Sequence, residues 1–212
     1  MVATACSALN TNTAGSPPAK FWGAALDALV YREYLDPAYT IPNTAPIIAA
    51  DGNEPPWNRR VPGAVLYAKP GEHLHIHVRN ADPADCHSFH LHGLHYGIGS
   101  NGAWPFGVRA HDGRRSDEIL PGQSWTYVFE PTDETIGPWV FHDHVRRVGS
   151  NINRGLFGGL IVRDARAAGV DHEIPLFVHQ LAQFPCCFQI ETMLQLVELS
   201  PFLVSTAGAG QR

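Results

Sequence analysis

The sequence feature that most constrains the fold is a histidine pair that occurs twice. His90 and His92 form one His-x-His pair, and His142 and His144 form a second pair further along the chain. Side chains two positions apart lie on the same face of an extended strand. Two such strands side by side would therefore present four imidazoles within reach of one another.

Four imidazoles in one place indicate a metal site. Imidazole binds copper, zinc, nickel and iron, and a nitrogen set without thiolate or required carboxylate favours copper or zinc over magnesium or calcium. The alternative is that the four histidines satisfy one another in a buried cluster. That arrangement leaves several ring nitrogens in need of partners in a crowded place, so metal binding is the stronger interpretation.

The rest of the chain has the pattern of a β protein. Short apolar or alternating segments are separated by turn signals, and the 20 glycines and 17 prolines suit tight turns between strands. This spacing predicts an all-β Greek-key sandwich in a single domain. The predicted strands cover residues 28–34, 63–71, 72–80, 124–130, 137–145, 155–162 and 174–181.

The segment 72–80 shows strict alternation. Leu74, Ile76 and Val78 share one face and should point to the core, because residues of one strand face alternate with those of the other. The opposite face should be turned to solvent. It carries the three histidines His73, His75 and His77.

The two ends differ in composition from the middle. Residues 1–20 are rich in small and polar residues without a period and are predicted to be a disordered leader, before the domain at 21–181. In the tail, 182–212, apolar residues at helical spacing predict a short amphipathic helix within 187–199. No export signal is visible at the start, and no apolar run approaches the roughly 18 residues of a membrane span.

Charge limits the partners. The 15 basic and 20 acidic residues give a net charge of −5, which offers no general attraction to nucleic acid or to an anionic membrane. We therefore expect neither a nucleic-acid partner nor a membrane span.

Three motifs stand in a fixed order. His-Ser-Phe-His-Leu-His-Gly occupies 87–93, Gly-Pro-Trp-Val-Phe-His-Asp-His occupies 137–144, and Gly-Leu-Phe-Gly-Gly-Leu-Ile-Val occupies 155–162. Together they resemble a cupredoxin domain of the multicopper oxidases, of the ceruloplasmin type, over residues 28–165. The resemblance implies a cupredoxin-like Greek-key β-sandwich with an irregular N-terminal extension, and it suggests a secreted or periplasmic protein.

In the family that these motifs resemble, two domains each supply four histidines to a trinuclear copper cluster that reduces dioxygen to water. The resemblance implies that His90 binds the type 2 copper and that His92, His142 and His144 bind the type 3 pair. Asp117 matches an acidic position often found near this cluster, which implies a proton donor outside the ligand set. Gly93 would let the backbone pass close to the metal.

The sequence also departs from the family pattern. A domain that binds type 1 copper has a cysteine between the last two histidines and another histidine five positions later, whereas Asp143 and Val148 stand there. We therefore expect no type 1 site. His87, at a type 1 position, has lost its thiolate partner, so His87 and His95 are expected to be structural or to support the ligands.

Two functional hypotheses follow. The first is a copper-dependent oxidoreductase that acts on dioxygen and needs a partner, either a second copper domain or a symmetry-related subunit, as a homo-oligomer or as part of a larger oxidase. The second is a non-catalytic copper-binding module or a truncated fragment of a larger multicopper oxidase. A mononuclear enzyme of the cupin kind is less supported, because no glutamate follows the first histidine pair at the spacing of that fold.

Overall fold

Strands dominate the part of the chain that the structure describes. The computed structural model describes residues 4–13, 19–21, 24–26, 29–43, 64–164, 166 and 177. The strands are β1 (Thr4–Thr13), β2 (Ala19–Phe21), β3 (Ala24–Leu26), β4 (Leu29–Tyr34), β5 (Val65–Ala68), β6 (His73–Asn80), β7 (His90–Leu91), β8 (Ser124–Phe129), β9 (Gly137–His142) and β10 (Phe157–Val162). The helical segments are α1 (Val148–Arg154) and the 3-10 turns η2 (Ile98–Ser100) and η3 (Asp133–Thr135).

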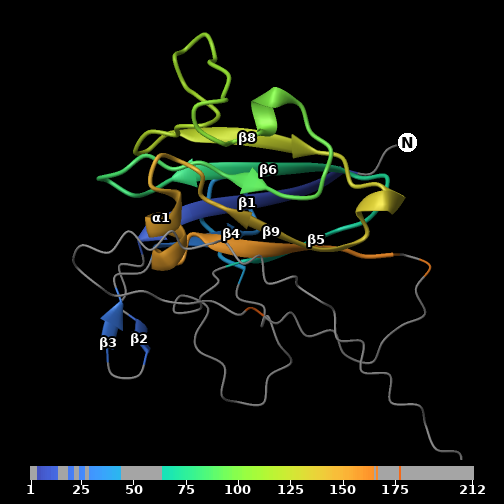
Figure 1. Cartoon of the computed structure of the whole chain (residues 1–212), viewed down its shortest axis with the longest axis horizontal. Helices are drawn as coiled ribbons and strands as arrows, with labels where there is room; N and C mark the ends of the chain where they lie inside the picture. The colour runs from blue at the N-terminus through green and yellow to red at the C-terminus, as the bar shows by residue number, and fades with distance from the viewer. Residues whose placement is uncertain are drawn as a thin grey trace, which may run out of the picture.

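The strands form two four-stranded sheets and a separate β2–β3 hairpin. One sheet has the order β4-β1-β6-β8 and the other has the order β5-β10-β9-β7. Figure 1 shows β8, β6 and β1 side by side in one layer, with β9 and β5 in the other. Each sheet is mixed, because β1 runs parallel to β6, and β5 runs parallel to β10, among otherwise antiparallel pairs. The all-β sandwich predicted from the sequence is confirmed.

The core lies between the inner faces of the two sheets. Leu74, Ile76 and Val78 of β6 are completely buried, as their alternation predicts, and they pack in the same cluster as Phe141 and Leu160 of the opposite sheet. Each fully buried aliphatic side chain contributes roughly 1.5–3 kcal/mol of transfer free energy. The outer face of β6 carries His73, His75 and His77, which are only partly buried.

The N-terminal region differs from the predicted disordered leader. Residues Thr4–Thr13 form β1, which pairs antiparallel with β4 and parallel with β6. Strand pairing uses main-chain donors and acceptors, so a segment can complete a sheet without the apolar alternation on which the prediction relied. The division of the chain at residues 20 and 181 stays a prediction.

A short helix that was not predicted from the sequence lies between β9 and β10. Helix α1 ends at Arg154 and is capped by Gly155, which adopts a left-handed conformation (φ 113°) and donates its N–H to Asn151 O and Ile152 O. Seven residues with a glycine at the second position give almost no helical periodicity to detect. The helix matters for the site because it places Asn151, which is buried.

Two predictions fall outside the described residues. They are the strand at 174–181, apart from Phe177, and the helix within the tail 182–212. Within the described part of the chain, no helix is long and apolar enough to cross a membrane.

Candidate metal centre

Strands β7 and β9 bring the two histidine pairs together. They are antiparallel neighbours, and their register sets His90 directly opposite His142. Both strands end early, so His92 and His144 lie one and two residues beyond them. The predicted strand 137–145 is therefore shorter than expected, and only one histidine of each pair is on a strand.

All four imidazoles nevertheless converge. The ring centroid of His90 lies 4.9 Å from that of His92, 5.5 Å from that of His142 and 5.0 Å from that of His144. The centroids of His92 and His142 are 5.1 Å apart, and those of His142 and His144 are 5.4 Å apart. We call these four residues the histidine cluster.

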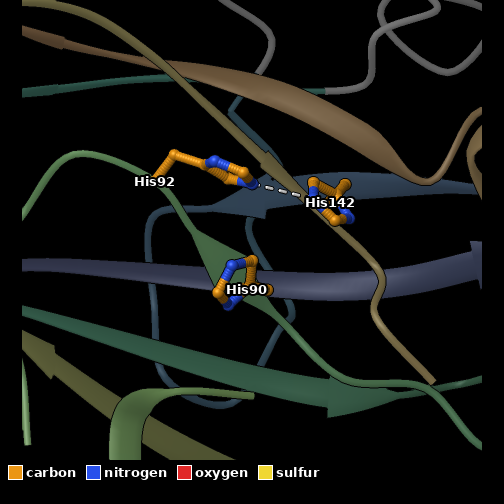
Figure 2. A group of neighbouring side chains, drawn as sticks. All are labelled: His90, His92 and His142. Carbon is orange, nitrogen blue, oxygen red and sulfur yellow. Dashed lines mark hydrogen bonds between the residues drawn. The ribbon is translucent and has the colours of Figure 1, made fainter. Parts of the chain in front are cut away.

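The ring nitrogens of three members point to a common space. One nitrogen each from His90, His92 and His142 can be chosen so that all lie within 4.8 Å of one another. The rings of His92 and His142 point toward each other, with 3.0 Å between their Nε2 atoms, and His90 lies beside them (Figure 2). Among the described residues, this is the group of side chains whose spacing suits a metal ion.

Backbone carbonyls fix the orientation of two of these rings. His90 Nδ1 lies 2.6 Å from Asn101 O, and His142 Nδ1 lies 2.9 Å from Asp143 O. A carbonyl oxygen can only accept, so each Nδ1 carries the proton and donates it. The Nε2 lone pair of each ring is thereby left for a ligand bond, which is the usual arrangement of a metal-binding histidine.

The site favours unprotonated imidazoles. Burial is the main cause that lowers the pKa of His142 to about 4, and the nearby imidazoles add to it against the opposing hydrogen bond to Asp143 O. Burial also lowers the pKa of His90 and of His92, and the charge of His144 lowers both further. These three side chains are therefore neutral near pH 7 and need lose no proton to bind a metal.

The donor set fits copper. It consists of imidazoles, and the carboxylate of Asp143, between His142 and His144 in the sequence, accepts hydrogen bonds from Ser88 N and Asn151 Nδ2. His144 Nδ1 is buried without a hydrogen-bond partner, which is an expensive state for a polar atom and one that a ligand bond would relieve. Imidazole nitrogens without an oxygen ligand suit copper or zinc.

Gly93 is required by packing against a side chain. It has a φ of 77°, and a Cβ atom there would lie 2.0 Å from Cε3 of Trp139. Only glycine fits this combination of backbone conformation and close contact. The sequence interpretation, in which Gly93 lets the backbone approach the metal, therefore named the right residue but not the contact that the structure describes.

His87 lies apart from the cluster, in a buried pocket with two carboxylates. Its Nε2 is 3.0 Å from Asp82 Oδ2, and its Nδ1 is 3.6 Å from Asp143 Oδ1. Burial alone would lower the pKa of His87, but Asp143 and then Asp82 outweigh it and raise that pKa. We call Asp82, His87 and Asp143 the His87 pocket. His95, the other histidine expected to support the site, is exposed, and its carbonyl accepts a hydrogen bond from Glu130 N.

Asp117 is completely buried and paired with an arginine. Its Oδ1 and Oδ2 accept hydrogen bonds from Arg115 Nε and Nη2 at 3.0 and 2.8 Å. Burial acts to raise the pKa of Asp117, but the hydrogen bonds from Arg115 and from the backbone of Gly107 outweigh it and lower that pKa. The carboxylate form is favoured, so the predicted proton-donor role requires this ion pair to open.

Three residues that contribute to the site were not predicted from the sequence. Asn101 orients His90 through its carbonyl, Ser88 Oγ accepts a hydrogen bond from His144 N at 3.1 Å, and Asn151 Nδ2 donates to Asp143 at 2.6 Å. Ser88 stands between predicted site residues and could have been considered. Neither asparagine carries a sequence signal, because each acts through a contact that only the folded chain creates.

The chain is similar to known proteins over much of its length. A family model described as multicopper oxidase matches residues 54–167. The chain is 30% identical over 149 residues to Ferroxidase HEPHL1 of Homo sapiens. The aligned region covers 66% of this chain and 12% of that protein. It is also 28% identical over 141 residues to ceruloplasmin of Rattus norvegicus. That aligned region covers 63% of this chain and 12% of that protein.

A solved structure supports the fold. The multi-copper oxidase from Pseudomonas Thermotolerans matches with a TM-score of 0.55 and 20% identity, over 81% of this chain and 32% of that one. The chain therefore spans about a third of the length of this structural neighbour and 12% of the length of each of the two curated relatives.

Proposed function

This chain belongs to the multicopper oxidase family, whose cofactor is copper, and we propose that it supplies half of the ligands of a type 2/type 3 trinuclear copper cluster. In this proposal the ligands are the four members of the histidine cluster, His90, His92, His142 and His144. The chemistry that this copper would provide, when bound, is the reduction of dioxygen to water. The chain is then a copper-binding oxidoreductase domain.

The observation that carries the proposal is the convergence of ring nitrogens. Ring nitrogens of His90, His92 and His142, which come from both histidine pairs, lie within 4.8 Å of one another, and backbone carbonyls accept the Nδ1–H hydrogen bonds of His90 and His142. Simple mutual satisfaction of the imidazoles is a weaker account, because it leaves His144 Nδ1 buried without a partner.

A partner is part of the proposal. Four histidines are half of the set that the family uses, so a second copper domain or a symmetry-related subunit has to face the cluster. His90, His92 and His144 are only partly buried, which supports this, because a complete mononuclear site would enclose its ligands more fully. A homo-oligomer and a larger oxidase both satisfy the requirement.

Electron entry also has to come from elsewhere. Asp143 occupies the place of the type 1 cysteine, and both of its oxygens accept hydrogen bonds within the protein. A carboxylate in that position gives no blue copper centre, because that centre depends on a thiolate. The reducing substrate would therefore act on the partner.

The second candidate is a non-catalytic copper-binding module or a fragment of a larger oxidase. The same observation at Asp143 favours it, since the described residues provide a ligand set but no type 1 copper site through which electrons could enter. Copper binding is common to both candidates, and only dioxygen reduction separates them.

Electron paramagnetic resonance of the copper-loaded protein, together with its mass in solution and its oxygen consumption, tests the proposal. We expect a type 2 signal, no intense blue absorption, and oxygen consumption only by assemblies that contain a facing partner. An intense blue band would contradict the reading of Asp143. Turnover by a strictly monomeric sample would contradict the shared cluster, and assembled, copper-loaded protein without turnover would favour the non-catalytic module.

A further inference from the structure

Asp143 has contacts that the proposed ligand set does not use. It lies between His142 and His144 and is completely buried. Its Oδ1 accepts a hydrogen bond of 2.7 Å from Ser88 N, and its Oδ2 accepts one of 2.6 Å from Asn151 Nδ2. A buried carboxylate with both oxygens engaged is held in one orientation.

These hydrogen bonds connect the two histidine stretches directly. Ser88 precedes His90 by two residues, so the bond from its N–H fixes the start of the first stretch against Asp143 in the second. A reciprocal bond runs the other way, because Ser88 Oγ accepts from His144 N at 3.1 Å. In addition to the pairing of β7 with β9, the two stretches are therefore joined by two hydrogen bonds of Ser88, one to the Asp143 side chain and one to the His144 backbone.

The backbone of Asp143 acts on a ring of the cluster. Its carbonyl accepts the Nδ1 proton of His142, which directs Nε2 of that ring toward His92. Its N–H donates to Leu156 O at 3.1 Å, and Asn151 ties its carboxylate to helix α1. One residue thus links both histidine stretches, the helix and the start of β10.

The burial of this carboxylate has a local explanation. His87 lies 3.6 Å away on one side, and the other nitrogen of His87 pairs with Asp82. Asp82 accepts hydrogen bonds from His87 and from Ala84 N, and no contact with the histidine cluster is described for it. Asp82 is therefore a second buried aspartate at the same imidazole, without the bonds that join the two stretches.

We propose that Asp143 is a positioning residue for the copper ligands, which holds the two histidine pairs at ligating distance through Ser88 and through its own backbone. This inference rests on the proposed function, since it assumes that the cluster binds copper. The residue that stands where a type 1 copper domain has its cysteine thus helps to build the neighbouring copper site. In this account Asp82 has no share in that role.

The test compares four proteins: the wild type, Asp143→Ala, Asp143→Asn and the matched control Asp82→Asn. Circular dichroism establishes that each is folded, copper titration gives its affinity, and electron paramagnetic resonance gives the hyperfine splitting of bound copper. Removal of a partner that orients metal ligands reduces metal affinity by about 10–100-fold. We expect a loss of that size in Asp143→Ala, with a changed hyperfine splitting.

The two asparagine variants separate positioning from general stability. Asp143→Asn keeps an oxygen for Ser88 N, and its amide can bond Asn151 after that side chain turns over, so we expect rescue to within about threefold of the wild type. Asp82→Asn should lower thermal stability but leave the copper affinity and the hyperfine splitting unchanged.

The outcomes distinguish the inference from the function beneath it. Folded wild-type protein that binds no copper would overturn the proposed function and this inference with it. Wild-type affinity and splitting in folded Asp143→Ala would overturn the positioning role alone, as would an equal loss in Asp143→Asn or in Asp82→Asn. If Asp143→Ala does not fold, Asn151→Ala replaces it, with an expected loss of about fivefold for one hydrogen bond, and unchanged affinity there overturns the role.

Discussion

The histidine cluster and the His87 pocket are built from the same two stretches of sequence, 82–92 and 142–144, yet they hold their imidazoles in opposite ways. In the cluster, backbone carbonyl oxygens accept hydrogen bonds from the Nδ1–H groups of His90 and His142. Ring nitrogens of His90, His92 and His142 face a common space. In the pocket, carboxylates face both nitrogens of His87. The partner of each ring nitrogen, rather than the spacing of histidines, separates a ring prepared for a metal from a ring held between two carboxylates.

The largest expected effect is on copper binding by the cluster. His142→Ala removes a buried imidazole whose Nε2 lies 3.0 Å from that of His92, so we expect copper affinity to fall by at least about a hundredfold, more than for loss of an orienting partner. Copper titration measures it. His95→Ala is the matched control, because His95 belongs to the same histidine-rich region but is exposed. Equal losses in both variants would remove the distinction between the cluster and its surroundings.

The next effect is on the stability of the pocket. His87→Ala leaves two buried carboxylates without their shared imidazole, and removal of one partner of a buried ion pair lowers the free energy of unfolding by about 3–5 kcal/mol. Urea denaturation measures this change. Copper affinity should change by less than tenfold, on the order of what a partner outside the ligand set contributes. A loss of copper without a loss of stability would place His87 among the ligands.

The pH dependence should have opposite signs in the two regions. The pKa of His142 is lowered to about 4, so between about 4 and the ordinary value of 6.5 the unfolded chain binds more protons, and the metal-free fold loses stability as pH falls. The pKa of His87 is raised, so its contribution is complete below 6.5 and is lost as pH rises through the raised value.

Urea denaturation of the metal-free protein across this pH range checks both signs. His142→Gln should reduce the loss of stability at acid pH, by at most roughly 3 kcal/mol for a shift of this size. His87→Gln should reduce the fall in stability on the alkaline side instead. The same change of slope in both variants would show that the two regions do not differ as described.

The smallest expected effect concerns the outer face of β6. His75 is only partly buried and lies on the side of the strand away from the core, so His75→Ala should change copper affinity by less than about twofold and stability by less than roughly 0.5 kcal/mol. Copper titration and urea denaturation check both values. A larger loss of copper would mean that the three histidines on the outer face of β6, His73, His75 and His77, bind the metal that we assign to the histidine cluster.

Much of the fold and the centre of the site could be predicted from the sequence. Alternation predicted that Leu74, Ile76 and Val78 face the core, and all three are completely buried. Two His-x-His pairs predicted that four imidazoles meet. The rest depended on contacts between distant segments. Strand β1 pairs with β4 and β6 through the backbone register, and no pattern in the sequence tells that the carboxylate of Asp143 is buried against Ser88 and Asn151.

Anomalous diffraction at the copper absorption edge, from crystals of the copper-loaded protein, tests the central claim most directly. The account predicts anomalous density among the rings of His90, His92, His142 and His144. It predicts none between His87 and Asp143, where carboxylates already occupy the space around the imidazole. Copper density in the His87 pocket, or its absence from the histidine cluster in a protein that binds copper, would contradict the account.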